Sequence, residues 1–238
     1  MISVLNVFIS KLKKVDYKLD SKIRLINLFV IIFARSFSLA RGFLKSLGLK
    51  KRGKILFIGK NVKLKHKNFI KLGNGVTLDD YVVLDGLSED GLILGDNVKV
   101  GSYTIIACSG SLKNLGKGIK IGSNSGIGDF CYFGAAGGIK IGRNVIMGQN
   151  VRFHSENHNF NRIDIPRKDQ GVTNKGIVIS DDCWIGSGVV FLDGIQVGEG
   201  CVIGANTLVN KDIPPYSVAV GNPVKVSKNR KEMRGDEK

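Results

Sequence analysis

The sequence predicts an all-β solenoid, a chain wound into a three-sided coil of short strands. Two observations predict it. Large apolar residues recur every six positions over much of residues 55–210, a spacing that fits neither an amphipathic helix nor plain strand alternation. In addition, the last two sets of these residues are offset by eighteen positions throughout, which is one turn of a coil with three six-residue sides.

The repeated unit is an apolar residue followed by glycine or a polar residue. We expect the apolar side chain to point into the coil, and the next residue to lie at a corner where a bulky Cβ would be in the way. Each coil buries its apolar residues only by stacking on its neighbours, so both ends need caps. The residues predicted to point inward are Leu72 and Leu78; Leu94, Val100 and Ile106; Ile121, Ile127 and Phe133; Ile141, Met147 and Phe153; Ile179, Ile185 and Phe191; Val197, Ile203 and Val209.

Three segments follow from this pattern. Residues 1–54 form a basic, partly apolar helical extension, and residues 55–211 form the coil, from which a loop at 154–178 departs. Residues 212–238 form a tail that we expect to pack back on the coil, with a disordered end. Because glycine is frequent (31 residues) and proline scarce (4), the composition favours repeated tight corners over disorder.

The N-terminal extension carries most of the positive charge. Residues 1–54 hold thirteen Lys/Arg against Asp16 and Asp20, so 13 − 2 = +11 of a total of +16. The apolar run Leu25 to Ala34 is about half as long as a membrane span, and it begins too late for a secretory signal. Two interpretations stay open: residues 11–54 contact an anionic membrane surface, or the segment packs on the coil or on a partner subunit.

Nucleic acid binding is not expected, because the basic stretch contains no recognisable RNA- or DNA-binding module. The four cysteines do not suggest a disulfide framework or a metal site, since no paired Cys or Cys/His spacing exists. Cys131, Cys183 and Cys201 each lie two residues before an inward-facing position, which predicts small, half-buried packing residues. Reduced cysteines favour a cytoplasmic protein, one at the inner face of the plasma membrane if the extension binds lipid.

The loop at 154–178 is where we expect chemistry, because long excursions from a rigid scaffold commonly carry function. It holds His154 and His158, two of the three histidines. A hydroxyl is a poor nucleophile until a base removes its proton, and neutral imidazole suits that task near pH 7. The third histidine, His66, is interpreted as a surface residue.

At the level of motifs the chain resembles a known enzyme family. The run VRFHSENHNFNRIDIPRKDQG, followed by IVISDDCWIGSGVVFLDGIQVGEGCVIGANTLVNKDIPPYSVAVGNPVKV, resembles the hexapeptide-repeat O-acetyltransferases, which are left-handed parallel β-helices. The similarity is greatest to those acting on capsule, O-antigen or exopolysaccharide sugars, and extends to the maltose and galactoside acetyltransferases. It covers about residues 90–228, whereas residues 1–54 have no counterpart in these enzymes.

The resemblance implies acetyl transfer from acetyl-CoA to a sugar hydroxyl of a cell-surface polysaccharide or its precursor, by a homotrimer and without a metal. It makes His158 the general base and implies that a backbone N–H near Gly186 or Ser187 stabilises the oxyanion. Trp184 directly precedes the inward-facing Ile185 and is therefore expected to face outward, where it would line the acceptor groove with Asn157 and Asp129. His154 aligns with no catalytic position of the family and is expected to orient the loop beside this groove. Residues implied in binding CoA are Gly186, Ser187, Gly204, Ala205, Lys211, Lys225 and Lys228.

One segment departs from the family. Where relatives acting on small sugars often place Asp or Asn, this chain reads IGDFCYFGAAGG, with only Asp129. Its aromatic residues, Phe130, Tyr132 and Phe133, predict an open aromatic floor suited to a longer or lipid-linked glycan.

Two other functions stay open: an antibiotic or xenobiotic O-acetyltransferase, and a non-catalytic scaffold of a glycan-assembly complex. γ-Class carbonic anhydrases, nucleotide-sugar pyrophosphorylases and serine acetyltransferases fit poorly. The chain lacks the histidine arrangement of the first, the nucleotide-binding domain of the second and the large helical domain of the third.

Overall fold

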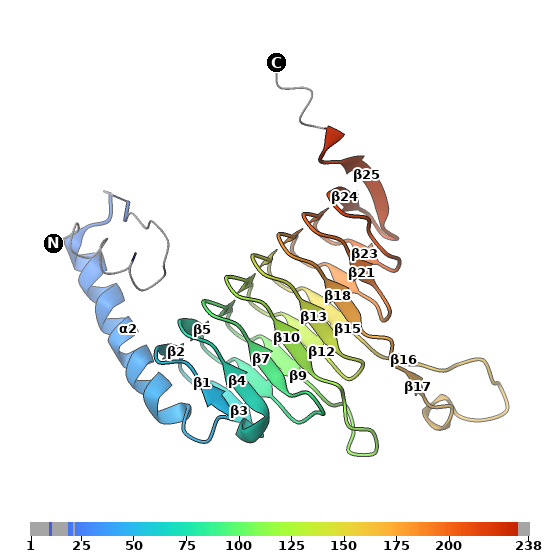
Figure 1. Cartoon of the computed structure of the whole chain (residues 1–238), viewed down its shortest axis with the longest axis horizontal. Helices are drawn as coiled ribbons and strands as arrows, with labels where there is room; N and C mark the ends of the chain where they lie inside the picture. Colours follow the sequence, from blue (N-terminus) through green and yellow to red (C-terminus); the bar gives the residue numbers. More distant parts are fainter. Residues whose placement is uncertain (1–9, 11–18, 21, 233–238) are drawn as a thin grey trace.

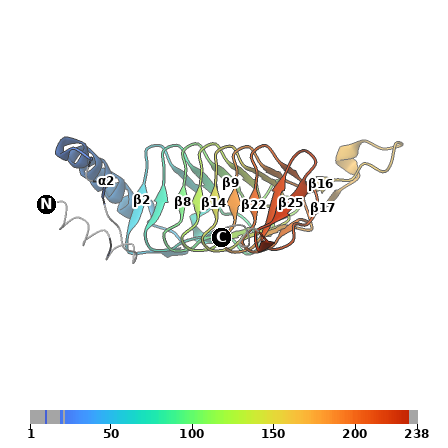
Figure 2. The same cartoon turned by 90° about the horizontal axis from the view of Figure 1, so that it is seen from above.

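Three parallel sheets of short strands form the sides of a prism, which is a left-handed parallel β-helix with one N-terminal helix (Figure 1). The computed structural model describes residues 10, 19–20 and 22–232. Seen from above, the coils stack in a straight row, with the helix at one end and a hairpin leaving near the other (Figure 2). The fold class predicted from the six-residue spacing is confirmed.

Each coil contributes one strand to each sheet. Sheet A contains β1 (Lys51–Arg52), β4 (Ile70–Leu72), β7 (Leu92–Leu94), β10 (Ile119–Ile121), β13 (Ile139–Ile141), β18 (Ile177–Ile179) and β21 (Gln196–Val197). Sheet B contains β2 (Leu56–Ile58), β5 (Val76–Leu78), β8 (Lys99–Val100), β11 (Gly126–Ile127), β14 (Ile146–Met147), β19 (Trp184–Ile185), β22 (Val202–Ile203), β24 (Ser217–Val220) and β25 (Lys225–Asn229). Sheet C contains β3 (Lys63–Lys65), β6 (Val83–Asp85), β9 (Ile105–Ala107), β12 (Tyr132–Gly134), β15 (Arg152–His154), β20 (Val190–Phe191) and β23 (Leu208–Val209).

The core is a set of columns in which equivalent residues of successive coils lie above one another. Every residue predicted to point inward is buried. The largest side chains, Phe133, Phe153 and Phe191, form a continuous stack with ring centroids 4.7 and 4.6 Å apart. Because stacking removes both ring faces from water, this column contributes a large share of the hydrophobic stabilisation.

The corners explain why glycine follows the apolar residue. A Cβ added at Gly142 would lie 2.3 Å from the Asp181 carboxylate of the next coil, so glycine is needed for close stacking. The left-handed backbone conformation falls two residues later, at Asn144 (φ 58°), a residue type that tolerates it. Close approach and positive φ are therefore separate requirements of one corner.

The coil extends beyond the predicted limits at both ends. It begins at β1 rather than at residue 55, because β1 already pairs with β4. At the other end, β24 pairs in parallel with β22, and β25 folds back antiparallel to β24. The predicted tail thus continues sheet B, while its last residues, 233–238, lie outside the described residues.

Helix α2 (Leu25–Lys45) covers the N-terminal end of the coil through contacts with β2. Its close approach depends on Gly42, where an added Cβ would lie 2.0 Å from the Leu56 carbonyl oxygen. The helix is long and apolar enough to cross a membrane by length and composition alone, and most of it is exposed. The predicted packing on the coil is present, while the first residues of the extension, 1–9, 11–18 and 21, lie outside the described residues.

Candidate functional site

The chain leaves the coil after β15 and returns at β18, as a hairpin that projects from the prism (Figures 1 and 2). Its base is a short antiparallel ladder of β16 (Asn157–His158) and β17 (Val172–Thr173). Near its tip lies a single 3₁₀ turn, η2 (Arg167–Asp169). The predicted loop at 154–178 is thus an ordered arm built on the corner between sheets C and A.

His158 lies in the first strand of this arm, exposed to solvent and opposite Val172. The following residue, Asn159, fixes the arm twice: its backbone N–H donates to the Gly171 carbonyl (3.0 Å), and its side-chain amide donates to the Gln170 carbonyl (3.0 Å). Consequently the predicted base is held on paired backbone, with its imidazole available to a ligand or a neighbouring chain. Asn157, beside it on β16, is exposed as well.

His154 lies at the end of β15, on the outer face of sheet C. The centroid of its ring lies 5.9 Å from that of the Tyr132 ring. The Tyr132 ring also lies close to Gly134, since a Cβ added at this glycine would be 3.2 Å from it. Partial burial and, secondarily, the nearby Arg152 cation lower the pKa of His154, because both disfavour the imidazolium. His154 is therefore maintained as a neutral imidazole over a wider pH range than a free histidine.

Trp184 projects outward from β19, and 59% of its surface is exposed. The position beside it in the preceding coil is Ile146, which is 61% exposed. These two side chains form an apolar patch on the outer face of sheet B. The outward tryptophan was predicted from the sequence, whereas Ile146 was not, because the hairpin between the two coils breaks their eighteen-residue spacing.

The small residues at the corner between sheets B and C have a structural reason. A Cβ at Gly186 would lie 2.5 Å from the Ala205 nitrogen, and one at Gly204 would lie 2.7 Å from Val220. Both glycines are thus required for stacking, whatever else they do.

The same corner leaves the Ser187 N–H free. In some earlier coils the equivalent N–H group donates to a side chain of the next coil, as Ser102 does to Asp129 (2.8 Å) and Gln149 to Ser187 (3.2 Å), whereas among the described residues the Asp129 N–H has no partner either. At Ser187 the next coil offers only Ala205, which has no side-chain acceptor. Among the described residues the Ser187 N–H has no partner, whereas the Gly186 N–H donates to Ile203 (2.8 Å). Of the two predicted oxyanion donors, Ser187 is the available one.

The predicted acceptor floor is partly wrong. Phe133 lies in the core stack rather than on the surface, because its position in β12 points into the prism. Tyr132 and Phe130 are exposed. One oxygen of Asp129 is already bound, since Oδ1 accepts the Ser102 N–H, so this residue closes a corner of the coil.

Phe130 belongs to a surface ladder that the sequence analysis missed. Tyr81, Tyr103 and Phe130 occupy the same corner of three successive coils, each with φ near 60°. Their rings stack face to face, with centroids 4.7 and 5.1 Å apart. Each ring is stabilised by stacking on the next ring, which offsets the conformational free energy cost of a left-handed backbone at these bulky residues.

The three lysines predicted to bind CoA are exposed and lie near the C-terminal end of the coil. Lys225 and Lys228 are on β25, paired with Val220 and Val218 of β24. Lys211 follows β23 at the corner between sheets C and A. Two of the three therefore lie on sheet B, the sheet that carries Trp184.

Within one chain the predicted site is divided by sheet C. Trp184 and the small corner residues lie where sheet B meets sheet C. His154 ends β15 at the opposite edge of sheet C, and the arm carrying His158 departs from there. One chain thus does not bring its predicted base together with Trp184 and the small corner residues, although Lys211 lies at the corner from which the arm departs.

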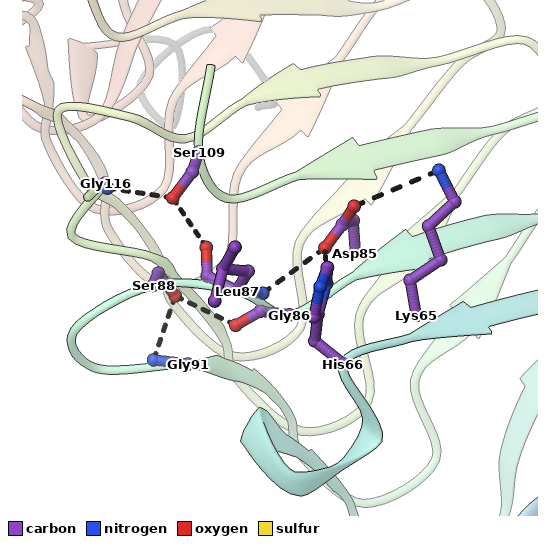
Figure 3. A network of polar contacts seen from close by, with 9 residues as sticks. All are labelled: Lys65, His66, Asp85, Gly86, Leu87, Ser88, Gly91, Ser109 and Gly116. Carbon is purple, nitrogen blue, oxygen red and sulfur yellow. Dashed lines mark hydrogen bonds and ion pairs between the residues drawn. The ribbon is translucent and has the colours of Figure 1, made fainter. Parts of the chain in front are cut away.

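His66 is exposed, as predicted, and it has a defined partner. Its Nδ1 lies 2.7 Å from an Asp85 carboxylate oxygen, and Lys65 approaches the other oxygen at 4.0 Å (Figure 3). Asp85 Oδ1 also accepts the Leu87 N–H at 3.3 Å. Ser88 and Ser109 fix the adjoining turns through their hydroxyls (Figure 3). The network stabilises a corner of the coil.

The cysteines are core residues. All four are free and buried, more completely than the half-buried positions predicted for three of them. Burial raises the pKa of Cys108 to about 12 and also raises that of Cys131, so these thiols stay protonated and unreactive. The described residues contain no cluster of three or more His, Cys, Asp or Glu side chains that could hold a metal ion.

Comparison with known proteins agrees with the geometry. Residues 176–211 match the family described as Bacterial transferase hexapeptide (six repeats). Residues 176–211 thus carry this repeat. The match covers the coils that contain Trp184, the free Ser187 N–H and Lys211.

Two relatives extend the similarity. The chain is 34% identical over 165 residues to Probable acetyltransferase Rv3034c of Mycobacterium tuberculosis (strain ATCC 25618 / H37Rv), which covers 69% of this chain and 51% of the relative. It is 43% identical over 114 residues to SACOL2570, a candidate acetyltransferase of Staphylococcus aureus (strain COL), covering 48% of this chain and 56% of the relative. The chain thus spans about half the length of the curated relatives it matches.

A solved structure has the same fold. It is the crystal structure of AntD, an N-acyltransferase from Bacillus cereus in complex with dTDP and 3-hydroxybutyryl-CoA. The TM-score is 0.53 at 21% identity, over 82% of this chain and 90% of the other.

Proposed function

We propose that the protein is an acetyltransferase that transfers the acetyl group of acetyl-CoA to a sugar hydroxyl of a cell-surface polysaccharide or its precursor. The observation that carries the proposal is the position of His158, an exposed imidazole held on the paired backbone of an arm beside a hexapeptide coil. The similarity to acetyltransferases of other organisms supports the reaction class. The sugar acceptor rests on the motif resemblance.

In the proposed reaction, the neutral imidazole of His158 removes the hydroxyl proton as the oxygen attacks the thioester carbonyl. The resulting oxyanion accepts a hydrogen bond from the Ser187 N–H, which has no partner within the chain. When the tetrahedral intermediate collapses, the C–S bond breaks, and the imidazolium returns its proton to the CoA thiolate. General-base catalysis of this kind contributes about 10² to 10⁴ in rate.

CoA would lie along the corner between sheets B and C. Trp184 and Ile146 offer an apolar surface to its thin arm. Lys225 and Lys228 lie at the end of sheet B, where their charges suit the phosphates, with Lys211 nearby in the chain. Asn157 and His154 would contact the acceptor near the arm. Asp129 is better explained as a corner residue, because Oδ1 is already bound.

We also propose that the active enzyme is a homotrimer, with each site formed by two neighbouring chains. Because sheet C separates the arm from Trp184 and the Ser187 N–H within one chain, a neighbour's arm would supply His158 to complete the site. A cyclic trimer provides three equivalent boundaries of this kind.

Thiol release from acetyl-CoA tests the reaction. Wild type and His158→Ala are compared with a panel of glycans, lipid-linked precursors, free sugars and chloramphenicol-like drugs. We expect transfer to a glycan that falls about 10² to 10⁴-fold in the variant. Transfer to the drugs alone would favour a xenobiotic acetyltransferase. CoA binding without transfer to any acceptor would mean that the substrate is missing from the panel, and absence of CoA binding would favour a scaffold.

Co-expression of two inactive variants tests the shared site. His158→Ala and Trp184→Ala each remove one half of the site. If the halves come from different chains, about one site in four in randomly mixed trimers is intact, and activity returns. If each chain holds a whole site, mixing restores nothing.

A further inference from the structure

The positive charge of the protein is concentrated at one end of the prism. Residues 21–78 contain fourteen Lys/Arg and no Asp or Glu. Residues 79–238 contain eighteen Lys/Arg and eighteen Asp/Glu, so 18 − 18 = 0. The remaining +2 of the total of +16 comes from residues 1–20. Helix α2 and the first coil therefore form a strongly basic end on an otherwise neutral body.

One side of α2 is fixed to this end. Gly42 is buried against β2, where an added Cβ would lie 2.0 Å from the Leu56 carbonyl oxygen. The Arg41 guanidinium donates to the Ile58 carbonyl (2.9 Å), and the Lys45 ammonium donates to the Val62 carbonyl (2.6 Å). These contacts hold the C-terminal half of the helix across the first coil.

The opposite side of α2 is apolar and uncovered. Five large side chains recur at spacings of four, three, four and seven residues, which places them on one stripe of a helix. Each is between 52% and 67% exposed. We call them the α2 stripe: Ile26, Val30, Phe33, Phe37 and Leu44. Phe29 is also exposed next to it, and exposed apolar side chains gathered in this way mark a protein or membrane interaction site.

The anchored geometry favours a helix lying on a surface over one crossing it. Arg41 and Lys45 bind the coil, and Arg35 lies over the Phe57 ring of β2 at 4.9 Å. Of the described helix, only residues 25–34 precede these anchors, and ten helical residues span about 15 Å, about half of the hydrocarbon thickness. A basic end with an apolar stripe is the composition of an interfacial helix.

We propose that the α2 stripe docks the protein on an anionic lipid bilayer, with the helix in the plane of the interface. Charge complementarity favours an anionic lipid surface, rather than a second copy of the chain, as the partner of the α2 stripe. Two copies joined through this surface would bring two ends of net charge +14 together, whereas anionic headgroups attract each Lys/Arg near the surface. This inference is independent of the acetyl-transfer reaction, and either can fail alone.

Vesicle flotation of the full-length protein tests the proposal. Vesicles of phosphatidylcholine mixed with phosphatidylglycerol are compared with vesicles of phosphatidylcholine alone. We expect binding to the anionic vesicles that weakens as salt is added. The double variant Phe33→Ser/Phe37→Ser should bind at least about tenfold more weakly, because it removes the aromatic surface that enters the interface.

Leu112→Ser is the matched control, because Leu112 is 88% exposed on a corner of the coil yet lies outside the basic end. Its binding should equal that of wild type. Equal binding of wild type to neutral and anionic vesicles, or undiminished binding of the double variant, would overturn the proposal. The proposal would also be overturned if wild type bound no vesicles but formed a larger oligomer that the double variant did not form. The α2 stripe would then be an interface between copies of the chain. Thermal unfolding of all variants ensures that only folded proteins are compared.

Discussion

The coil and the helix at its end use apolar residues in opposite ways. In the coil, every predicted inward residue is buried, and outward positions of the central strands are often charged, as at Lys120 and Lys140. In α2, only Leu28 and Gly42 are buried, and the large side chains face outward. The coil satisfies its apolar residues within one chain. The helix leaves its apolar side chains exposed, available to a partner outside the chain.

The same division holds for charge and for the proposed tasks. The neutral body carries the arm with His158, the Ser187 N–H and the patch around Trp184, whereas the basic end carries the α2 stripe. Under these two proposals, one chain separates acetyl transfer from docking on a membrane, because a solenoid transmits little between coils that are not neighbours.

The largest effect is expected from removing a member of the aromatic core stack. Phe153 contacts both Phe133 and Phe191, so Phe153→Ala should lower the free energy of unfolding by about 3 to 5 kcal/mol. Phe33→Ala, an equal truncation on the α2 stripe, should change it by less than about 0.5 kcal/mol. Chemical denaturation of both variants makes the comparison, and equal losses would mean that the stripe is covered within the molecule.

A smaller loss of stability is expected from a substitution at the contact between α2 and the coil. Gly42→Leu places a side chain against the Leu56 carbonyl and should destabilise the protein by about 1 to 3 kcal/mol by displacing α2 from the coil. Ala40→Leu is the control, since Ala40 is exposed on the same helix. Chemical denaturation again reads the change. A tolerated Gly42→Leu would show that the helix is not seated on the coil.

The smallest expected effect is a pH dependence of the free energy of unfolding that arises from His154 in the coil. Because burial lowers the pKa of His154 in the folded state, the unfolded state binds a proton more readily. The contribution of His154 to stability is therefore complete above the unfolded pKa of about 6.5 and is lost as the pH falls below it. Denaturation between about pH 7.5 and 5 should show a shallow decline for wild type and a shallower one for His154→Gln. Identical slopes would contradict the assignment.

Much of the coil was predictable because its pattern is local. The six-residue spacing identified the inward residues, and glycine after them identified the corners. The position of Trp184 directly before an inward residue also predicted its exposure correctly. Such features depend on residues close together in the sequence, and stacking repeats them from coil to coil.

Features that depend on where another coil lies were missed or wrong. Phe133 was assigned to the surface because its aromatic neighbours were, although its place in the six-residue spacing already put it in the core. Asp85, the partner of His66, is nineteen residues away, and the match depends on the length of the intervening corner. The bounds of α2 were not predicted either, because its C-terminal half is held by Arg41 and Lys45, which bind carbonyls of the coil.

The most direct test of the division between body and end is to measure transfer and vesicle binding on the same two variants. His158→Ala should lose transfer and keep its binding to anionic vesicles. Phe33→Ser/Phe37→Ser should lose vesicle binding and keep transfer to a soluble acceptor. A variant that loses both activities while remaining folded would contradict the separation of the two tasks.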